Sequence, residues 1–422
     1  MIRILFTHYG DKQIRGSERC LIDLVKHLDR GRFLPVVWCN GEQLAHEMRE
    51  LDVLVYQTDF PILFGGYDSR YDFRGFRALV RQGEDIVRTH AIDILHANSG
   101  APNQWLNLVA RRCRLPLLSH LHSRYPLRDR FTLGLHHTSR VVGVSQPIIQ
   151  QLLDDGIDPG RVKVIANGID TEHQDRAEPV NLRPELGLCA QDFIAFTAAS
   201  LIHRKGVDLL IQAVAKLRRR QLPVHLVIAG DGPEKESLQA LSRQCEVEHA
   251  IHFLGSRDDV PGILRGGIDA FVSGAREEVF GLALAEANLA SIAVIAPAVG
   301  GIPGVIADNL TGLLVPVDNS VSIAQAISCL YDHPELKRKL GDAGRQRVLD
   351  CFRIENYVAH FEALYLELYA DTSRHLRPFS NISARSLLGM LAGAGKVCLR
   401  NTVLSKSTSP ASQRLPLRLR QS

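Results

Sequence analysis

The chain has 422 residues, of which 45% are hydrophobic and 23% charged, and its formal net charge is +4. This length is enough for two domains of ordinary size, and the balance of apolar and charged residues is typical of a globular protein rather than a disordered one. No apolar run approaches the ~20 residues that a membrane-spanning helix needs, and the N-terminal apolar run is too short for a secretory signal. The eight cysteines are scattered without a Cys-x-x-Cys pair, which argues against a zinc cluster or a disulfide framework and favours a reducing, cytoplasmic compartment.

Short apolar runs alternate with longer amphipathic segments through the first part of the chain. Continuous apolarity is expected of strands that are covered on both faces, and strand–helix–strand repetition predicts a parallel, doubly wound sheet. The expected helices include 18–28 and 74–90. The expected strands are 2–7, 34–39, 52–57, 92–97, 116–121, 140–145 and 161–167.

A polar stretch with two prolines, 172–192, interrupts this pattern, and we interpret it as an interdomain linker. A second series of apolar runs follows, and 354–370 is the last strong helical pattern. The expected strands of this series are 193–200, 223–230, 250–255, 267–274 and 291–297. The fold class is therefore α/β, with two Rossmann-like domains facing each other, and a ligand is expected in the cleft outside the carboxyl ends of the strands.

Two of the loops that follow strands have the composition of phosphate-binding turns. Gly16 and Ser17 open the helix after the first strand, where a glycine lets backbone N–H groups approach an anion and the helix start carries about half a positive charge. An ordinary strand–helix turn explains Gly16 better when it is considered by itself. Arg204 and Lys205 precede Gly206 and a helix, and two cations there suit a diphosphate, although a solvated basic turn explains them equally well.

The segment REEVFGLALAE, residues 276–286, contains two glutamates, Glu278 and Glu286. Glu278 follows an expected strand and is predicted to face the cleft, whereas Glu286 lies in a mostly apolar helix, where a buried charge needs a partner. The helix is expected to start near Phe280. Its unpaired donors would then be the backbone N–H groups of Phe280, Gly281 and Leu282. A ligand with phosphates in its middle and a sugar at each end fits this arrangement, although surface helices commonly carry glutamates.

Eight segments, in this order, resemble the retaining GT-B glycosyltransferases of family four (glycosyl transferases group 1) over about residues 1–370. They are 15–24, 119–126, 144–157, 164–170, 204–211, 229–233, 278–286 and 299–315. The resemblance implies two Rossmann-like domains. The first comprises residues 1–175 and a crossing helix, 354–371, that returns to it. The second, 190–353, would bind the nucleotide-sugar.

The resemblance also implies roles for individual residues. Glu286 would hydrogen-bond the ribose hydroxyls of the donor, and Glu278 would hold the donor sugar near the reacting carbon. Arg204 and Lys205 would neutralise the diphosphate, which Gly16 would contact from the first domain.

His122 matches the family histidine that approaches the donor sugar and the acceptor, and we prefer it to His120. With Glu278 and Lys205 it completes the expected catalytic set. The chain also departs from the family pattern, in ways that bear on donor choice and activity. The departures are Ser200 in place of an arginine, Gly274-Ala275 in place of Pro-Ser, and Gly304 in place of an acidic residue.

The implied function is retaining transfer of a hexose from a UDP- or GDP-sugar to a saccharide or lipid-linked saccharide, in surface polysaccharide or glycolipid assembly. The sequence contains no Asp-x-Asp, so we expect basic residues rather than a metal ion to hold the diphosphate, and we expect no cofactor. Two alternatives are a sugar-nucleotide-binding or scaffold protein that has lost activity and a nucleotide-sugar 2-epimerase.

The last segment, 372–422, contains nine arginines and lysines and no acidic residue. A disordered basic extension is the simpler interpretation. The sharper one is peripheral contact with anionic lipid at the inner face of the plasma membrane, where each basic residue contributes about 1 kcal/mol. Nucleic acid is not an expected partner, because the rest of the chain shows no concentrated basic stretch.

Overall fold

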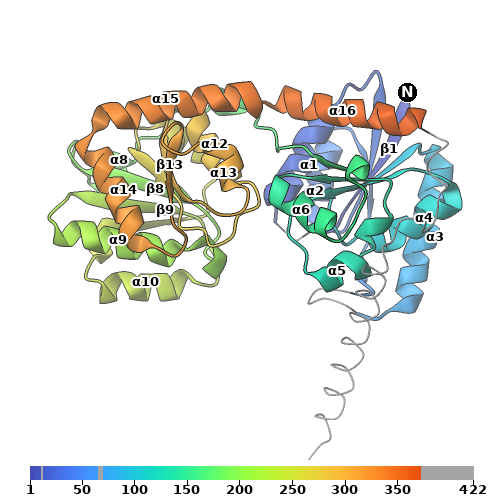
Figure 1. Cartoon of the computed structure of the whole chain (residues 1–422), viewed down its shortest axis with the longest axis horizontal. Coiled ribbons are helices and arrows are strands. Elements are labelled where there is room, and N and C mark those ends of the chain that lie inside the picture. The colour runs from blue at the N-terminus through green and yellow to red at the C-terminus, as the bar shows by residue number, and fades with distance from the viewer. Residues whose placement is uncertain (11–12, 65–69, 372–422) are drawn as a thin grey trace, which may run out of the picture.

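The computed structural model describes residues 1–10, 13–64 and 70–371. Two parallel sheets form the centres of two α/β domains (Figure 1), and the architecture is GT-B, as the sequence predicts. The first sheet has seven strands in the order β3-β2-β1-β4-β5-β6-β7. These are β1 Ile2–His8, β2 Phe33–Cys39, β3 Leu54–Gln57, β4 Ile94–Ala97, β5 Leu117–Leu121, β6 Arg140–Gly143 and β7 Val162–Val164.

Helices cover both faces of the first sheet, which explains why its strands are continuously apolar. One face packs against α1, α2 and α16, and the other packs against α3 and α4. The helices of this part are α1 Gly16–His27, α2 Glu42–Glu50, α3 Phe73–His90, α4 Asn103–Cys113, α5 Leu127–Thr132, α6 Gln146–Asp154 and α16 Ile354–Ala370.

The second sheet has six strands in the order β10-β9-β8-β11-β12-β13. The strands are β8 Phe193–Ala198, β9 Val224–Ala229, β10 Ile251–Gly255, β11 Ala270–Val272, β12 Ala293–Pro297 and β13 Gly312–Val315. The helices are α9 Val207–Arg219, α10 Lys235–Gln244, α11 Val260–Arg265, α12 Leu282–Leu289, α13 Ile302–Val305, α14 Ser320–Asp332 and α15 Pro334–Cys351.

Some features differ from the sequence-based expectations. The apolar pattern did not predict β13, which is only four residues long. The polar stretch 172–192 lies between the two sheets, but it contains two helices, α7 Thr171–Arg176 and α8 Leu182–Leu186. Backbone contact holds this stretch on the second domain, since the N–H of Val180 donates to the carbonyl of Gly262 at 2.9 Å. The sequence alone could not predict this contact, because it depends on α11 lying beside the stretch in the folded domain.

The chain crosses between the two domains twice, and the two crossings are hydrogen-bonded to each other. The N–H of Ile169 donates to the carbonyl of Phe352 at 2.7 Å, and the N–H of Ile354 donates to the carbonyl of Ile169 at 3.0 Å. In Figure 1, α15 lies along the second domain and α16 continues over the first. Phe361 and Tyr365 of α16 are completely buried against the first sheet, so this helix is part of the first domain's core.

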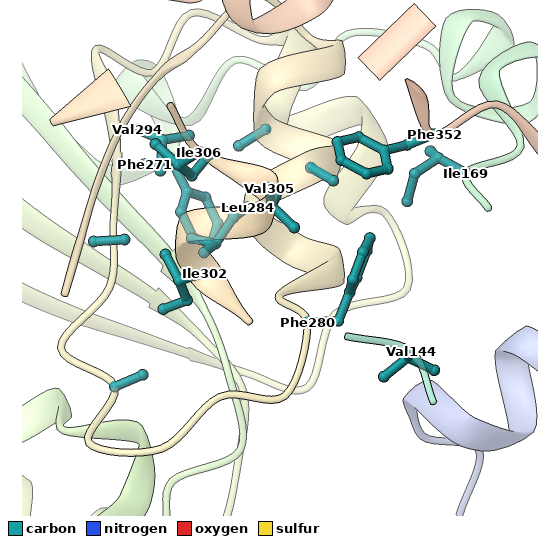
Figure 2. Close-up of a cluster of buried hydrophobic side chains, with 14 of the residues drawn as sticks. Val144, Ile169, Phe271, Phe280, Leu284, Val294, Ile302, Val305, Ile306 and Phe352 are labelled. Carbon is teal, nitrogen blue, oxygen red and sulfur yellow. The ribbon is translucent and has the colours of Figure 1, made fainter. Parts of the chain in front are cut away.

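A cluster of apolar side chains joins the domains beside these crossings (Figure 2). Phe280, Leu284 and Ile302 come from the second domain, and the cluster extends to Val144 of the first domain and Ile169 of the crossing. The rings of Phe280 and Phe352 meet edge to face, with their centroids 5.6 Å apart. Each such buried side chain contributes about 1.5–3 kcal/mol, so the cluster fixes the start of α12 next to the first domain.

Among the helices of the described residues, none is long and apolar enough to cross a membrane. The interpretations of the basic segment 372–422 lie outside the described residues.

Candidate active site

Both sheets reverse their strand order at a point where ligands bind in this type of fold. In the first sheet the reversal lies between β1 and β4, and in the second it lies between β8 and β11. The loops that follow these four strands carry most of the site residues expected from the sequence. Figure 1 shows α12 and α13 on the side of the second domain that faces the first.

The first-domain side of the site is the start of α1. The N–H of Arg15 donates to Oε2 of Glu18 at 3.1 Å, and the hydroxyl of Ser17 donates to the same oxygen at 3.0 Å. Oε1 of Glu18 lies 2.8 Å from Nε2 of His8, and both side chains are almost fully buried. Burial favours a higher pKa for Glu18, but the hydrogen bond and charge of His8 outweigh it and lower the pKa to about 2. The turn at Gly16 is therefore built around a fixed negative charge.

The second-domain side is a basic turn, His203–Lys205, followed by Gly206. Gly206 has φ +62°, and a Cβ there would lie 1.9 Å from the carbonyl oxygen of Gly274, so only glycine fits. The turn directs Nζ of Lys205 to Oε2 of Glu278 at 2.6 Å, and the two side chains are 21% and 14% exposed. The structure thus joins two of the expected site residues in an ion pair.

Arg204 is in the same turn, and its side chain is exposed. The neighbouring arginine with fixed partners is Arg276, which the sequence-based reasoning passed over. Its guanidinium binds both carboxylate oxygens of Asp208, at 2.9 and 2.7 Å, and one oxygen of Asp318 at 2.5 Å. Arg276 therefore ties the loop to α9, whereas the Arg204 side chain has no hydrogen-bond or ion-pair partner in the described part of the chain.

The helix α12 begins at Leu282 rather than near Phe280. The reason is Gly281, whose φ of +101° is outside the helical region. Within the described parts of the chain, the first N–H in this turn with a backbone acceptor is that of Leu284, which donates to the carbonyl of Gly281 at 3.0 Å. The N–H groups of Phe280, Gly281 and Leu282 have no acceptor among the described residues, which is usual at a helix start. The side chain of Phe280, in contrast, is buried.

Glu286 lies on α12 and faces α1 of the first domain. Its carboxyl has no hydrogen-bond or ion-pair partner among the residues that the structure describes. Burial and the charge of Asp23 raise the pKa of Glu286 to about 7, against an opposing effect of Arg19. A Cβ on Gly16 would lie 3.3 Å from Cδ1 of Leu282, which shows how closely the two helix starts approach.

His122 follows β5 and is partly exposed, whereas His120 is fully buried. Nε2 of His122 lies 3.1 Å from Oδ1 of Asn98. Burial and the nearby His8 lower the pKa of His122 to about 3, so its imidazole is neutral at physiological pH. The sequence-based reasoning missed His8, Glu18 and Asn98, although the position of His8 at the end of β1 was a usable signal.

A model described as Glycosyltransferase Family 4 matches residues 14–173, and one described as Glycosyl transferases group 1 matches residues 181–347. The chain belongs to the family-four glycosyltransferases. The first matched region contains Gly16 and His122, and the second contains Lys205, Glu278 and Glu286.

Among curated relatives, this glycosyltransferase is 28% identical over 307 residues to N-acetyl-alpha-D-glucosaminyl L-malate synthase from Bacillus anthracis, with 70% of this chain and 80% of the relative covered. It is 30% identical over 233 residues to alpha-maltose-1-phosphate synthase from Mycolicibacterium smegmatis, with 51% of this chain and 58% of the relative covered.

Solved structures agree in fold. A glycosyltransferase from Rickettsia africae superposes with a TM-score of 0.76 at 21% identity, covering 88% of this chain and 99% of that one. Anabaena Alr3699/HepE in complex with UDP superposes with a TM-score of 0.74 at 22% identity, covering 87% and 100%.

Proposed function

We propose that this glycosyltransferase moves a hexose from a UDP-sugar, or a GDP-sugar, to a saccharide or lipid-linked saccharide acceptor, with retention at the anomeric carbon and without a metal ion. The observation that carries the proposal is the ion pair of Lys205 and Glu278 beside the open N–H groups at the start of α12. UDP is the first nucleotide to test, since Alr3699/HepE has been solved with UDP and with UDP-glucose.

In this proposal the diphosphate lies between the two helix starts. Lys205, Arg204 and the open N–H groups of Phe280, Gly281 and Leu282 would neutralise it from the second domain. The turn at Gly16 would approach it from the first. Preorganised cations and N–H dipoles stabilise the charge that develops on a leaving group, so basic side chains can take the place of a metal ion.

The two glutamates would bind the sugars at either end. The carboxylate of Glu278 would accept hydrogen bonds from donor-sugar hydroxyls, and that of Glu286 would accept them from the ribose. Hydrogen bonds to ionised carboxylates are short and strong. The ribose would thus supply the partner that Glu286 lacks among the described protein groups.

The chemical step breaks the bond between the anomeric carbon and the leaving phosphate oxygen and forms a bond from that carbon to the acceptor oxygen on the same face. The proton of the acceptor hydroxyl passes to the leaving phosphate oxygen. His122, neutral and partly exposed, would hydrogen-bond a hydroxyl of the donor sugar or the acceptor. A protein that binds nucleotide-sugar without transfer and a 2-epimerase are the two competing outcomes.

The first experiment screens UDP, GDP and ADP by thermal shift, because a ligand that binds the folded state raises its stability. Nucleotide release from matching donors, with and without candidate saccharides, then separates transfer from binding alone and from epimerisation. Glu286→Ala should raise the KM for the donor, and Lys205→Ala should lower kcat, whereas the exposed neighbour Glu277→Ala should change neither. Activity that survives EDTA and a product with the donor's anomeric configuration by NMR are expected. An inverted product would disprove retention.

We also propose that the enzyme binds its acceptor at the inner face of the plasma membrane, and that the basic residues after Asp371 hold it there. Co-sedimentation with vesicles containing anionic lipid should require residues 372–422. Equal co-sedimentation of the full chain and a chain ending at Asp371 would reject this part of the proposal.

A further inference from the structure

Asn98 is the first residue after β4, at the reversal point of the first sheet, and it is completely buried. Its N–H donates to the carbonyl of Thr7 at 2.9 Å, which fixes its backbone against β1. Its side chain therefore enters the site from a rigid position rather than from a loop that can adjust.

The surroundings of this amide determine which way it points. Nδ2 of Asn98 donates to the carbonyl oxygen of Ser17 at 3.1 Å, and a carbonyl oxygen can only accept. Oδ1 must then be the atom that lies 3.1 Å from Nε2 of His122. An amide oxygen also only accepts, so Nε2 of His122 carries a proton, and Nδ1 of a neutral His122 ring does not.

The same side chain also contacts the pair formed by His8 and Glu18 behind the start of α1. Nδ2 of Asn98 and its backbone carbonyl oxygen each lie 3.0 Å from Nδ1 of His8. Nε2 of His8 in turn contacts Glu18. Asn98 thus joins the turn that opens α1 to His122. The titratable groups around the His122 ring are His8 of β1, Glu18 of α1, His96 of β4, and His120 of β5. The ring centroid of His120 is 4.0 Å away.

We propose that Asn98 is a positioning residue for glycosyl transfer, which holds His122 as its Nε2–H tautomer and couples that ring to the Gly16 turn. The lone pair on Nδ1 of His122 is then available to accept a hydrogen bond from a hydroxyl of the donor sugar or the acceptor. The catalytic part of this inference rests on the function proposed above, but the tautomer follows from the contacts of the free protein alone.

The tautomer can be measured in the wild-type protein without substrate. In the nitrogen-15 spectrum of histidine-labelled protein, the His122 ring, assigned by the loss of its signals in His122→Gln, should show a protonated Nε2 and an unprotonated Nδ1. A protonated Nδ1 would overturn the proposal. Because this readout needs no turnover, it can fail while the proposed function stands, and it can succeed when no transfer is found.

Two substitutions of Asn98 separate positioning from general support of the fold. Asn98→Ala removes the acceptor and should leave His122 as a mixture of tautomers, whereas Asn98→Asp retains an acceptor for Nε2–H and should preserve the tautomer. Misplacement of a reacting group by about 1 Å costs on the order of 100-fold in rate. We therefore expect Asn98→Ala to lower kcat between about 10- and 100-fold, with a smaller change in donor KM.

The exposed Asn356→Ala serves as the matched control and should behave as wild type. Circular dichroism and the thermal shift with UDP should show that the folded variants still bind nucleotide. If Asn98→Ala keeps both the wild-type tautomer and the wild-type kcat, Asn98 does not position His122.

Discussion

Replacing Glu286 with glutamine should make the free enzyme more stable at alkaline pH while weakening donor binding. Burial and Asp23 raise the pKa of this carboxyl from 4.5 to about 7. The folded protein therefore holds the proton more tightly than the unfolded chain does. Its stability falls as the pH rises through this interval, because ionisation is disfavoured in the folded state. Glutamine keeps the shape of the side chain and removes the charge.

The magnitude follows from the same pKa. At ~1.36 kcal/mol per pH unit, a rise from 4.5 to about 7 corresponds to about 3 kcal/mol of lost stability above pH 8. Near pH 5 the carboxyl is protonated in the folded state and only partly ionised in the unfolded chain, so the loss there is about 1 kcal/mol. The gain in stability of Glu286→Gln over wild type should therefore increase by about 2 kcal/mol from pH 5 to pH 8.

Urea unfolding followed by circular dichroism at pH 5 and pH 8 measures this difference. Tryptophan fluorescence is unsuitable because Trp38 and Trp105, the two tryptophans, are both in the core of the first domain, whereas α12 belongs to the second. Glu277→Gln, an exposed glutamate in the preceding loop, is the control and should match wild type. If Glu286→Gln gains no unfolding free energy over wild type, or gains the same amount at both pH values, the burial argument is refuted. The thermal shift with UDP should meanwhile be smaller than in wild type.

Three further predictions concern the two helix starts. Lys205→Ala should lower kcat on the order of 100-fold, as loss of a preorganised charge does, and a kcat within about twofold of wild type would exclude this lysine from the site. Gly300→Ala should impair donor binding, because the new Cβ would lie 1.8 Å from the carbonyl oxygen of Glu278. Gly304→Ala should not, because a Cβ at Gly304 would have no atom within 4 Å. Equal donor KM values in the two variants would contradict this prediction. Glu18→Gln should destabilise the protein by up to about 3 kcal/mol at neutral pH. The lowered pKa of about 2 for Glu18 stabilises the folded state above pH 4.5, and this stabilisation is lost as the pH falls towards 2. Urea unfolding of wild type and Glu18→Gln at pH 7 and pH 3 tests it, and a difference that does not shrink at low pH would contradict it.

The sequence by itself determined the architecture, because that information is local. Among the described residues, continuous apolar runs identified every strand except β13. Several observed strands are shorter than expected, such as Ala270–Val272 within 267–274. The pattern of 354–370 predicted α16 as a helix with the bounds Ile354–Ala370. The order of motifs along the chain indicated the family, which the matched models confirm. Loops that follow parallel strands meet at one edge of a sheet, so the sequence could also indicate where the site residues gather.

Only the tertiary structure decided how the charges in the site are paired. The ion pair of Lys205 and Glu278 joins residues 73 positions apart, and the contact of Asn98 with Ser17 spans 81 positions. No local pattern encodes such distances. The raised pKa of Glu286 likewise depends on α1 of the other domain lying against α12. Charge pairing and burial are properties of the assembled cleft, because they depend on which groups exclude water from one another after both domains have folded.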